Sequence, residues 1–245
     1  MAQYVYSMNR LGKIVPPKRE ILKDISLSFF PGAKIGVLGL NGSGKSTLLR
    51  AVNGLNKVTR GQVFVSHEGG QVDIANCDAG TLRNMRMNRI AMVFQQFALL
   101  PWRTVEENVG LGLELQGMTR DERRPIVDEK LKLVDLYQWK DKYTHELSGG
   151  MQQRVGLARA FATDADILLM DEPFSALDPL IRNHLQDFLL DWQRELKKTI
   201  IFVSHDLDEA LKEETRLGLE VIRSGETQAG ATRCAKGGGR HGQFR

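Results

Sequence analysis

Short apolar runs alternate with amphipathic stretches along most of the 245-residue chain. The run ADILLMDEP at 165–173 is closed by two acids and a proline, which is typical of a strand buried in a parallel sheet. Apolar residues then recur three and four positions apart, as in an amphipathic helix: Ile181, Leu185, Phe188, Trp192 and Leu196. Further strands are expected at 34–40, 89–96 and 199–205, and a helix from Gly44 to a stop at Gly54. This alternation predicts an α/β fold with a parallel sheet.

Two regions carry weaker patterns. The stretch 104–143 is mostly polar and helix-prone, with three candidates for one buried face: Ile126, Leu131 and Val134. After Ala210 the pattern fades, and three alternating residues suggest one more strand: Leu217, Leu219 and Val221. From 226 to 245 the chain is rich in glycine and has no apolar period, so we expect a disordered tail.

Charge separates this tail from the rest of the chain. The net charge is +4, and residues 227–245 carry four basic side chains and no acidic one: Arg233, Lys236, Arg240 and Arg245. The remaining 30 basic residues balance 30 acidic ones, so the body of the chain is neutral and no nucleic-acid partner is expected. Two cysteines make no disulfide framework, and no secretory or membrane-spanning run is present. A cytoplasmic protein is the expectation.

Residues 39–46 spell GLNGSGKS, the spacing of a phosphate-binding loop. The loop follows a predicted strand and opens a predicted helix, which is the context that such a loop requires. Lys45 is expected to reach the β- and γ-phosphates, and the Ser46 hydroxyl to ligate Mg²⁺. A chance glycine turn before a helix is the alternative. The predicted nucleotide-binding residues of the loop are Gly39, Asn41, Gly42, Ser43, Gly44, Lys45, Ser46 and Thr47.

Two further segments carry candidate chemistry. Asp171 ends the apolar run at 165–173 and is a candidate to hold Mg²⁺ through water, while Glu172 is placed to polarise an attacking water. Alone, this pair would be interpreted as two acids at a strand end. The octapeptide LSGGMQQR puts Ser148, Gly149 and Gly150 at a second helix N-terminus, which predicts a second phosphate site. The alternative is an ordinary serine N-cap followed by glycines.

Taken in order, the loop at 39–46, Gln95, LSGGMQQR, LLMDEP, SALD and His205 resemble the ATP-binding cassette (ABC) ATPases. The resemblance implies ATP and Mg²⁺ as cofactors. It also implies that two cassettes sandwich two ATP molecules, each held between the glycine loop of one and the SGG of the other. Gln95 would contact Mg²⁺ and the attacking water, His205 would touch the γ-phosphate, and Asp178 would end a loop that faces the partner.

Phosphoryl transfer needs charge neutralisation and an in-line water more than covalent chemistry. In the family's mechanism Lys45, Mg²⁺, the loop amides and the partner's Ser148 neutralise charge, while Glu172 and His205 position and polarise the water. The candidate catalytic residues are therefore Glu172, His205 and Gln95, and the candidate Mg²⁺ ligands are Ser46, Gln95 and Asp171.

The resemblance covers about residues 20–210 and implies a P-loop NTPase fold. This fold is α/β, an ABC-type nucleotide-binding domain with a mixed sheet core and an inserted α-helical subdomain. The domain is expected at 1–225, its helical subdomain at about 97–155, and the basic tail at 226–245. No aromatic residue stands clearly where the family stacks the adenine; Tyr4 and Tyr6 are the candidates.

Residues 51–212 resemble ATPase subunits of quaternary-amine importers, the glycine betaine and choline group, in segments such as RIAMVFQQFALLPWRTVEENVGLGLELQGM and KKTIIFVSHDLDEALK. The implied partners are a second copy in a homodimer, membrane permease subunits and, indirectly, a substrate-binding protein. The implied place is the inner face of the plasma membrane, as a peripheral protein. The segment FALLPW at 97–102 either helps to form a groove for a permease helix or fills the chain's own core.

Residues 1–50 resemble instead the first cassette of the ribosome-binding ABC-F translation factors. Those factors carry two cassettes joined by a long charged linker, whereas this sequence has one cassette and no linker. The importer is therefore favoured, and a translation factor acting on the ribosome is the alternative. DNA-repair ABC ATPases carry a long coiled-coil or zinc insertion, for which this sequence has no room.

Overall fold

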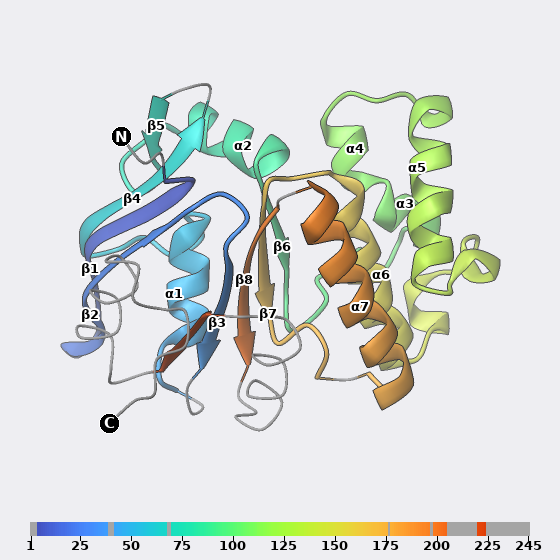
Figure 1. Ribbon diagram of the computed structural model, residues 1–245. Coiled ribbons are helices and arrows are strands. Elements are labelled where there is room, and N and C mark those ends of the chain that lie inside the picture. The colour runs from blue at the N-terminus through green and yellow to red at the C-terminus, as the bar shows by residue number, and fades with distance from the viewer. Residues whose placement is uncertain are drawn as a thin grey trace. The chain divides into compact units, whose positions relative to one another are not determined.

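A computed structural model describes residues 4–38, 42–67, 70–175, 177–196, 198–204 and 220–223. The chain divides into two compact units, which are described separately. The first unit comprises Met1–Leu82 and Thr199–Arg245, and the second comprises Arg83–Lys198. Figure 1 labels helices α1–α7 and strands β1–β8.

The first unit contains a four-stranded antiparallel sheet that the apolar pattern did not predict. Its order is β2-β1-β4-β5, drawn from blue to cyan in Figure 1. The bounds are β1 Tyr6–Val15, β2 Arg19–Phe29, β4 Arg60–His67 and β5 Gly70–Asp73. The β1–β2 register shifts at three places, and Arg10 and Asp24 adopt a left-handed backbone. Such irregularities break the two-residue period on which strand prediction depends.

The second sheet segment of this unit is parallel, as predicted. β3 (Lys34–Leu38) pairs with β8 (Thr199–Ser204) on one side and with β9 (Glu220–Arg223) on the other. The apolar side chains of β8, Ile200 to Val203, are all buried. The strands expected at 34–40 and 199–205 are thereby confirmed over 34–38 and 199–204, and residues 39, 40 and 205 lie outside the described residues.

The chain's last described strand, β9, contains Val221, one of the three alternating residues at the C-terminal end. The other two, Leu217 and Leu219, and the tail at 226–245 lie outside the described residues.

Helix α1 (Lys45–Val52) follows β3, and its C-cap is Asn53. Gly54 then takes a left-handed φ of 67°. The predicted stop at this glycine is confirmed, because an αL glycine commonly terminates a helix.

The second unit is built on two parallel strands. β6 (Ile90–Val93) pairs with β7 (Ile167–Asp171), with Val93 opposite Met170. All five residues of β7 are buried, as its continuous apolar run predicted. Helix α2 (Ala79–Asn88) begins in the first unit and leads into β6.

Helices make up the rest of the second unit. Their bounds are α3 Val105–Val109, α4 Leu111–Leu115, α5 Arg120–Leu133, α6 Gly149–Ala162 and α7 Pro179–Leu196, with 3₁₀ turns at Tyr137–Trp139 and Thr144–Glu146. Both α3 and α5 begin with a capping box, Thr104 with Glu107 and Thr119 with Glu122, which satisfies amides of the first turn. Helix α6 packs against α3, α4 and α5 (Figure 1).

The core of these helices matches most of the expected apolar face. Leu131 and Val134 are buried, whereas Ile126 is half-buried and the neighbouring Val127 takes the buried position. Each fully buried aliphatic side chain of this kind contributes about 1.5–3 kcal/mol. The packing of α5 on α6 therefore gives the second unit a core of its own.

Candidate active site

The described part of the glycine loop starts at Gly42, so the predicted residues Gly39 and Asn41 lie outside the described residues. Gly42 and Gly44 have φ values of 82° and 92°, a conformation that side chains disfavour. A Cβ atom on Gly44 would also lie 2.8 Å from Cγ2 of Ile21. The loop therefore needs glycine at Gly44 both for its backbone and for its close approach to β2.

The loop fits a phosphate group. Helix α1 begins at Lys45, and its N-cap Gly44 has no side chain that could cap the first turn. A helix N-terminus preceded by left-handed glycines is an anion-binding arrangement, because the amide groups converge on one point. Lys45 is buried, and the hydroxyl-bearing Ser46 and Thr47 are half-buried in the same turn.

The two predicted water-activating residues of the second unit meet directly. Nε2 of Gln95 donates to Oε2 of Glu172 at 3.0 Å, although 77 residues separate them. The register of the two strands explains the contact. Val93 lies opposite Met170, Gln95 comes two positions after Val93, and Glu172 comes two positions after Met170. The carboxyl ends of parallel strands meet at one edge of a sheet, so Gln95 and Glu172 emerge side by side.

Asp171 and Glu172 differ in how they leave the strand. Asp171 is fully buried at the end of β7, while Glu172 is 8% exposed and turns away with a φ of 51°. Buried carboxylates at such a place are expensive unless a cation or hydrogen-bond donors face them. The carboxylate of Asp171 and the side-chain oxygen of Gln95, whose Nε2 contacts the adjacent Glu172, are the oxygen ligands that Mg²⁺ prefers.

Sequence reasoning missed two residues that hold this site. Gln153, 1% exposed, donates through Nε2 to the main-chain oxygen of Glu172 at 3.3 Å. Arg159 donates to the main-chain oxygens of Phe97 and Ala98 at 2.8 Å each, and burial lowers the pKa of its guanidinium. Both residues lie on α6; Gln153 belongs to the octapeptide LSGGMQQR, but the sequence assigned a role only to its serine and glycines, and none to Arg159.

The LSGG segment opens α6 as the sequence predicted. Oγ of Ser148 accepts from the amide of Met151 at 3.3 Å, so the serine is the N-cap of the helix. A Cβ atom on Gly149 would meet nothing within 4 Å, and both Ser148 and Gly149 are exposed. The helix N-terminus is thus accessible from solvent, and the N-cap role of Ser148 does not conflict with a phosphate site.

Asp178 also has a structural role within the chain. Its Oδ1 accepts from the amides of Leu180 and Ile181 at 3.1 and 3.0 Å, which caps the start of α7. His205, predicted to touch the γ-phosphate, lies outside the described residues.

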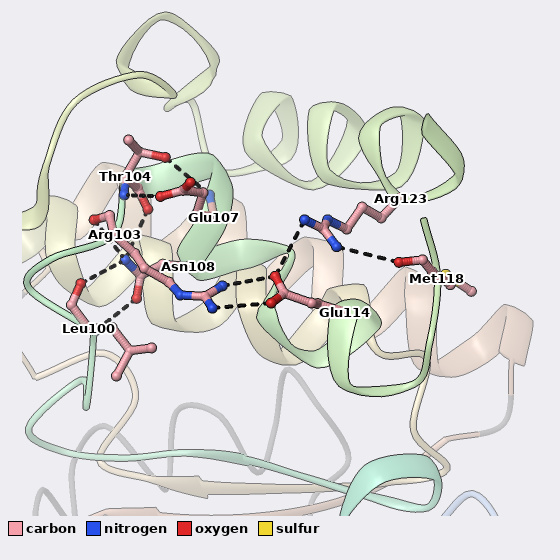
Figure 2. Close-up of polar contacts among 8 residues, drawn as sticks. All are labelled: Leu100, Arg103, Thr104, Glu107, Asn108, Glu114, Met118 and Arg123. Atoms are coloured by element: carbon pink, nitrogen blue, oxygen red, sulfur yellow. Dashed lines mark hydrogen bonds and ion pairs between the residues drawn. The ribbon is translucent and has the colours of Figure 1, made fainter. Parts of the chain in front are cut away.

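Beyond Gln95, a buried asparagine organises the segment at 100–104. Asn108 is fully buried; its Nδ2 donates to the main-chain oxygens of Leu100, Arg103 and Thr104, and its Oδ1 accepts from the amide of Leu100 at 2.8 Å (Figure 2). Trp102 in this segment is 70% exposed. The apolar FALLPW stretch therefore presents at least this side chain to the surface.

Two arginines converge on Glu114 at the edge of the same segment. Arg103 makes two hydrogen bonds to its carboxylate, at 2.9 and 3.1 Å, and Arg123 lies 3.3 Å away while also contacting the main-chain oxygen of Met118 (Figure 2). The hydrogen bond from Arg103 holds the pKa of Glu114 below its ordinary value of 4.5. The same bond raises the pKa of Arg103.

The adenine candidates fare differently. Tyr6 is fully buried, its ring stacks on Phe29 at 5.8 Å, and burial strongly raises the pKa of its hydroxyl. A buried ring cannot offer a face to a nucleotide, so Tyr6 is excluded. The ring of Tyr4 packs against Phe30 with centroids 4.9 Å apart.

A family model described as ABC transporter matches residues 22–175 of the chain. The chain belongs to the ABC transporter family. Among its members, the glycine betaine/proline betaine transport ATP-binding protein ProV of Escherichia coli (strain K12) is 49% identical over 205 residues, 84% of this chain and 50% of ProV. The glycine betaine transport ATP-binding protein OpuAA of Bacillus subtilis (strain 168) is 49% identical over 211 residues, 82% of this chain and 50% of OpuAA. The chain thus spans about half the length of these curated relatives.

Solved structures of ABC cassettes share the fold. The dimeric ATP-binding cassette MJ0796 bound to ADP and Pi matches with a TM-score of 0.80 at 32% identity, covering 89% of this chain and 93% of that one. The α/β fold of an ABC nucleotide-binding domain, predicted from the motifs, is confirmed. Among the described residues of this ABC family member, no helix is long and apolar enough to cross a membrane.

Proposed function

We propose that this chain is the ATP-hydrolysing subunit of a quaternary-amine importer. The observation that carries the proposal is the 3.0 Å contact between the exposed Gln95 and the buried Glu172 at the carboxyl ends of β6 and β7. A carboxylate can accept a proton from a water, and an adjacent amide can orient that water. Besides charge neutralisation, phosphoryl transfer to water requires a group that accepts the proton and a group that orients the water.

The other residues take supporting roles. The loop at Gly42–Lys45 would hold the phosphates, with Lys45 as the cation. Mg²⁺ would be held by Ser46, Asp171 and Gln95, and when bound it would neutralise charge on the phosphates. Glu172 would polarise the attacking water, and His205 keeps the γ-phosphate role that the family resemblance implies.

Two copies of the chain would share two ATP molecules. The exposed N-terminus of α6, with Ser148, Gly149 and Gly150, would face the nucleotide held by the glycine loop of the other copy. The similar cassette MJ0796 was solved as a dimer with ADP and Pi, which supports this arrangement. Asp178 would lie near the partner while it caps α7.

The transported substrate is proposed from the relatives' names. They include ATP-binding proteins for glycine betaine, proline betaine, carnitine and trimethylamine N-oxide, which are small molecules built around a fully substituted nitrogen. Permease subunits would be the direct partners at the inner face of the membrane, and a substrate-binding protein an indirect one. The exposed Trp102 in the FALLPW stretch supports a docking role for that stretch.

Uptake of labelled glycine betaine tests the proposal. Escherichia coli cells that lack ProV would be supplied with this chain, and with an Asp171→Asn variant as the control for expression. We expect ATP-dependent uptake from the first and none from the second. Recovery of the chain on ribosomes instead of on permease-containing membranes would favour the translation-factor alternative.

A further inference from the structure

Both sides of the Gln95–Glu172 contact use a costly backbone conformation. Glu172 has a φ of 51°, and Phe97 and Ala98, just after Gln95, have φ values of 36° and 46°. Residues with a side chain rarely adopt these angles, because Cβ then crowds the following carbonyl group. They persist where surrounding contacts hold them, often at functional sites.

One helix, α6, contributes contacts to both segments. Gln153 donates to the main-chain oxygen of Glu172, and Arg159 donates to those of Phe97 and Ala98. Gln153 is buried, so its bond is protected from competition by water, whereas Arg159 is half-buried and holds two main-chain oxygens at once.

The main-chain oxygen of Glu172 has local partners as well. The Oγ and the amide of Ser175 donate to it at 3.1 and 3.4 Å. Those donors belong to the same turn and would move with it. Gln153 lies 19 residues away on a different element, so its bond ties the turn to the rest of the unit.

We propose that Gln153 is a positioning residue: it fixes the turn at Glu172 so that the carboxylate meets Gln95. Arg159 fixes the segment after Gln95 from the same helix. Helix α6 thus supports both the turn at Glu172 and the segment that follows Gln95. This inference rests on the proposed function only in assigning water activation to Glu172.

The test is Gln153→Met in the full chain, which keeps the length of the side chain and removes its donor. The control is Gln116→Met, which removes a bond of the same kind at a half-buried position, from Nε2 to the main-chain oxygen of Met87 at 2.7 Å. We expect kcat to fall about 10-fold or more for Gln153→Met, since small misplacements of catalytic groups are costly. ATP affinity should stay within about twofold, because the loss falls on the chemical step. The thermal midpoint should drop no further than in the control.

A second background separates positioning from general loosening. In Glu172→Gln, adding Gln153→Met should lower the residual turnover no further, because the group that it positions is already gone. An unchanged kcat for Gln153→Met, or kcat and ATP affinity falling together, would overturn the proposal. If Gln153→Met does not fold, Gln153→Asn replaces it, because that shorter amide cannot reach the Glu172 oxygen. Wild-type turnover in Glu172→Gln would instead refute the proposed function.

Discussion

The glycine loop and the Gln95–Glu172 pair are built in opposite ways. The loop uses consecutive residues, with left-handed glycines at Gly42 and Gly44 and the helix start at Lys45. The pair depends on a contact across 77 residues and on a brace from Gln153 across 19. Local geometry makes the phosphate cradle, whereas packing of the second unit makes the water-activating pair. Nucleotide binding and chemistry should therefore be separable by mutation.

The largest effect is expected from a variant of the long-range pair, Gln95 and Glu172. Glu172→Gln keeps the size of the side chain and a possible contact with Gln95 but removes the proton acceptor. Turnover should fall at least ~10²-fold, as when a preorganised catalytic group is lost. ATP affinity, measured by isothermal titration calorimetry, should change little because the glycine loop is untouched.

A matched control is Glu129→Gln on α5, where the carboxylate is 70% exposed and pairs with Lys130. Its turnover should equal that of the wild type. Equal losses in the two variants would mean that Glu172 has no special role.

The next two variants change the glycine loop, the locally built part of the site. Gly44→Ala and Gly42→Ala both force a side chain into a left-handed backbone, at about 1 kcal/mol each. At Gly44 the new Cβ would also lie 2.8 Å from Ile21, while at Gly42 it would meet nothing within 4 Å. Gly44→Ala should therefore cost about 3 kcal/mol of unfolding free energy in urea titrations, given the usual cost of overpacking. Equal losses at the two positions would show that the approach to Ile21 is not tight.

The same contrast explains what the sequence could predict. Residues 39–46 predict a phosphate loop, because all the residues that such a loop needs are adjacent in the sequence. The apolar runs at 165–173 and 199–205 predict buried strands. The antiparallel sheet escaped prediction because the bulges in β1 disturb its alternation. The acidic end of the run at 165–173 pointed to Glu172, and a family resemblance pointed to Gln95. Their contact follows from the β6–β7 register, which no local pattern encodes.

Residues that act through distant main-chain groups were the hardest to foresee. Gln153 and Asn108 are polar residues within helices, a position that usually indicates a solvated face. Both are buried, and their hydrogen bonds become visible only when the segments around Glu172 and Leu100 are in place.

Asn108→Ala sharpens the comparison in the segment that follows Gln95. It removes four hydrogen bonds and leaves the half-buried amide of Leu100 without the Oδ1 acceptor. The loss should be about 2 kcal/mol, because main-chain groups of the segment at 100–104 lose their partner. Hydrogen exchange should report it as faster exchange at Leu100, with the amides of the glycine loop unchanged. Protection at Leu100 equal to that of the wild type would contradict the Asn108 clamp.

The smallest expected effect is at Glu114. Its pKa is lowered by Arg103, so its contribution is complete above its ordinary value of 4.5 and is lost as the pH falls through the lowered pKa. Because the carboxylate is 37% exposed, Glu114→Gln should cost only about 0.5 kcal/mol at neutral pH. Thermal melting at pH 7 and at acidic pH should show the difference from wild type shrinking with acidification. A difference that grows toward acidic pH would contradict the assignment.

The most direct test of the two-chain ATP sandwich is the mass of Glu172→Gln in solution, measured by light scattering with and without ATP–Mg²⁺. Without hydrolysis the sandwich should persist, so ATP should shift the particle from the 27.5 kDa of one chain to twice that mass. Adding Ser148→Arg at the exposed start of α6 should prevent the shift. A mass of one chain in saturating ATP, with ATP binding intact, would contradict the account.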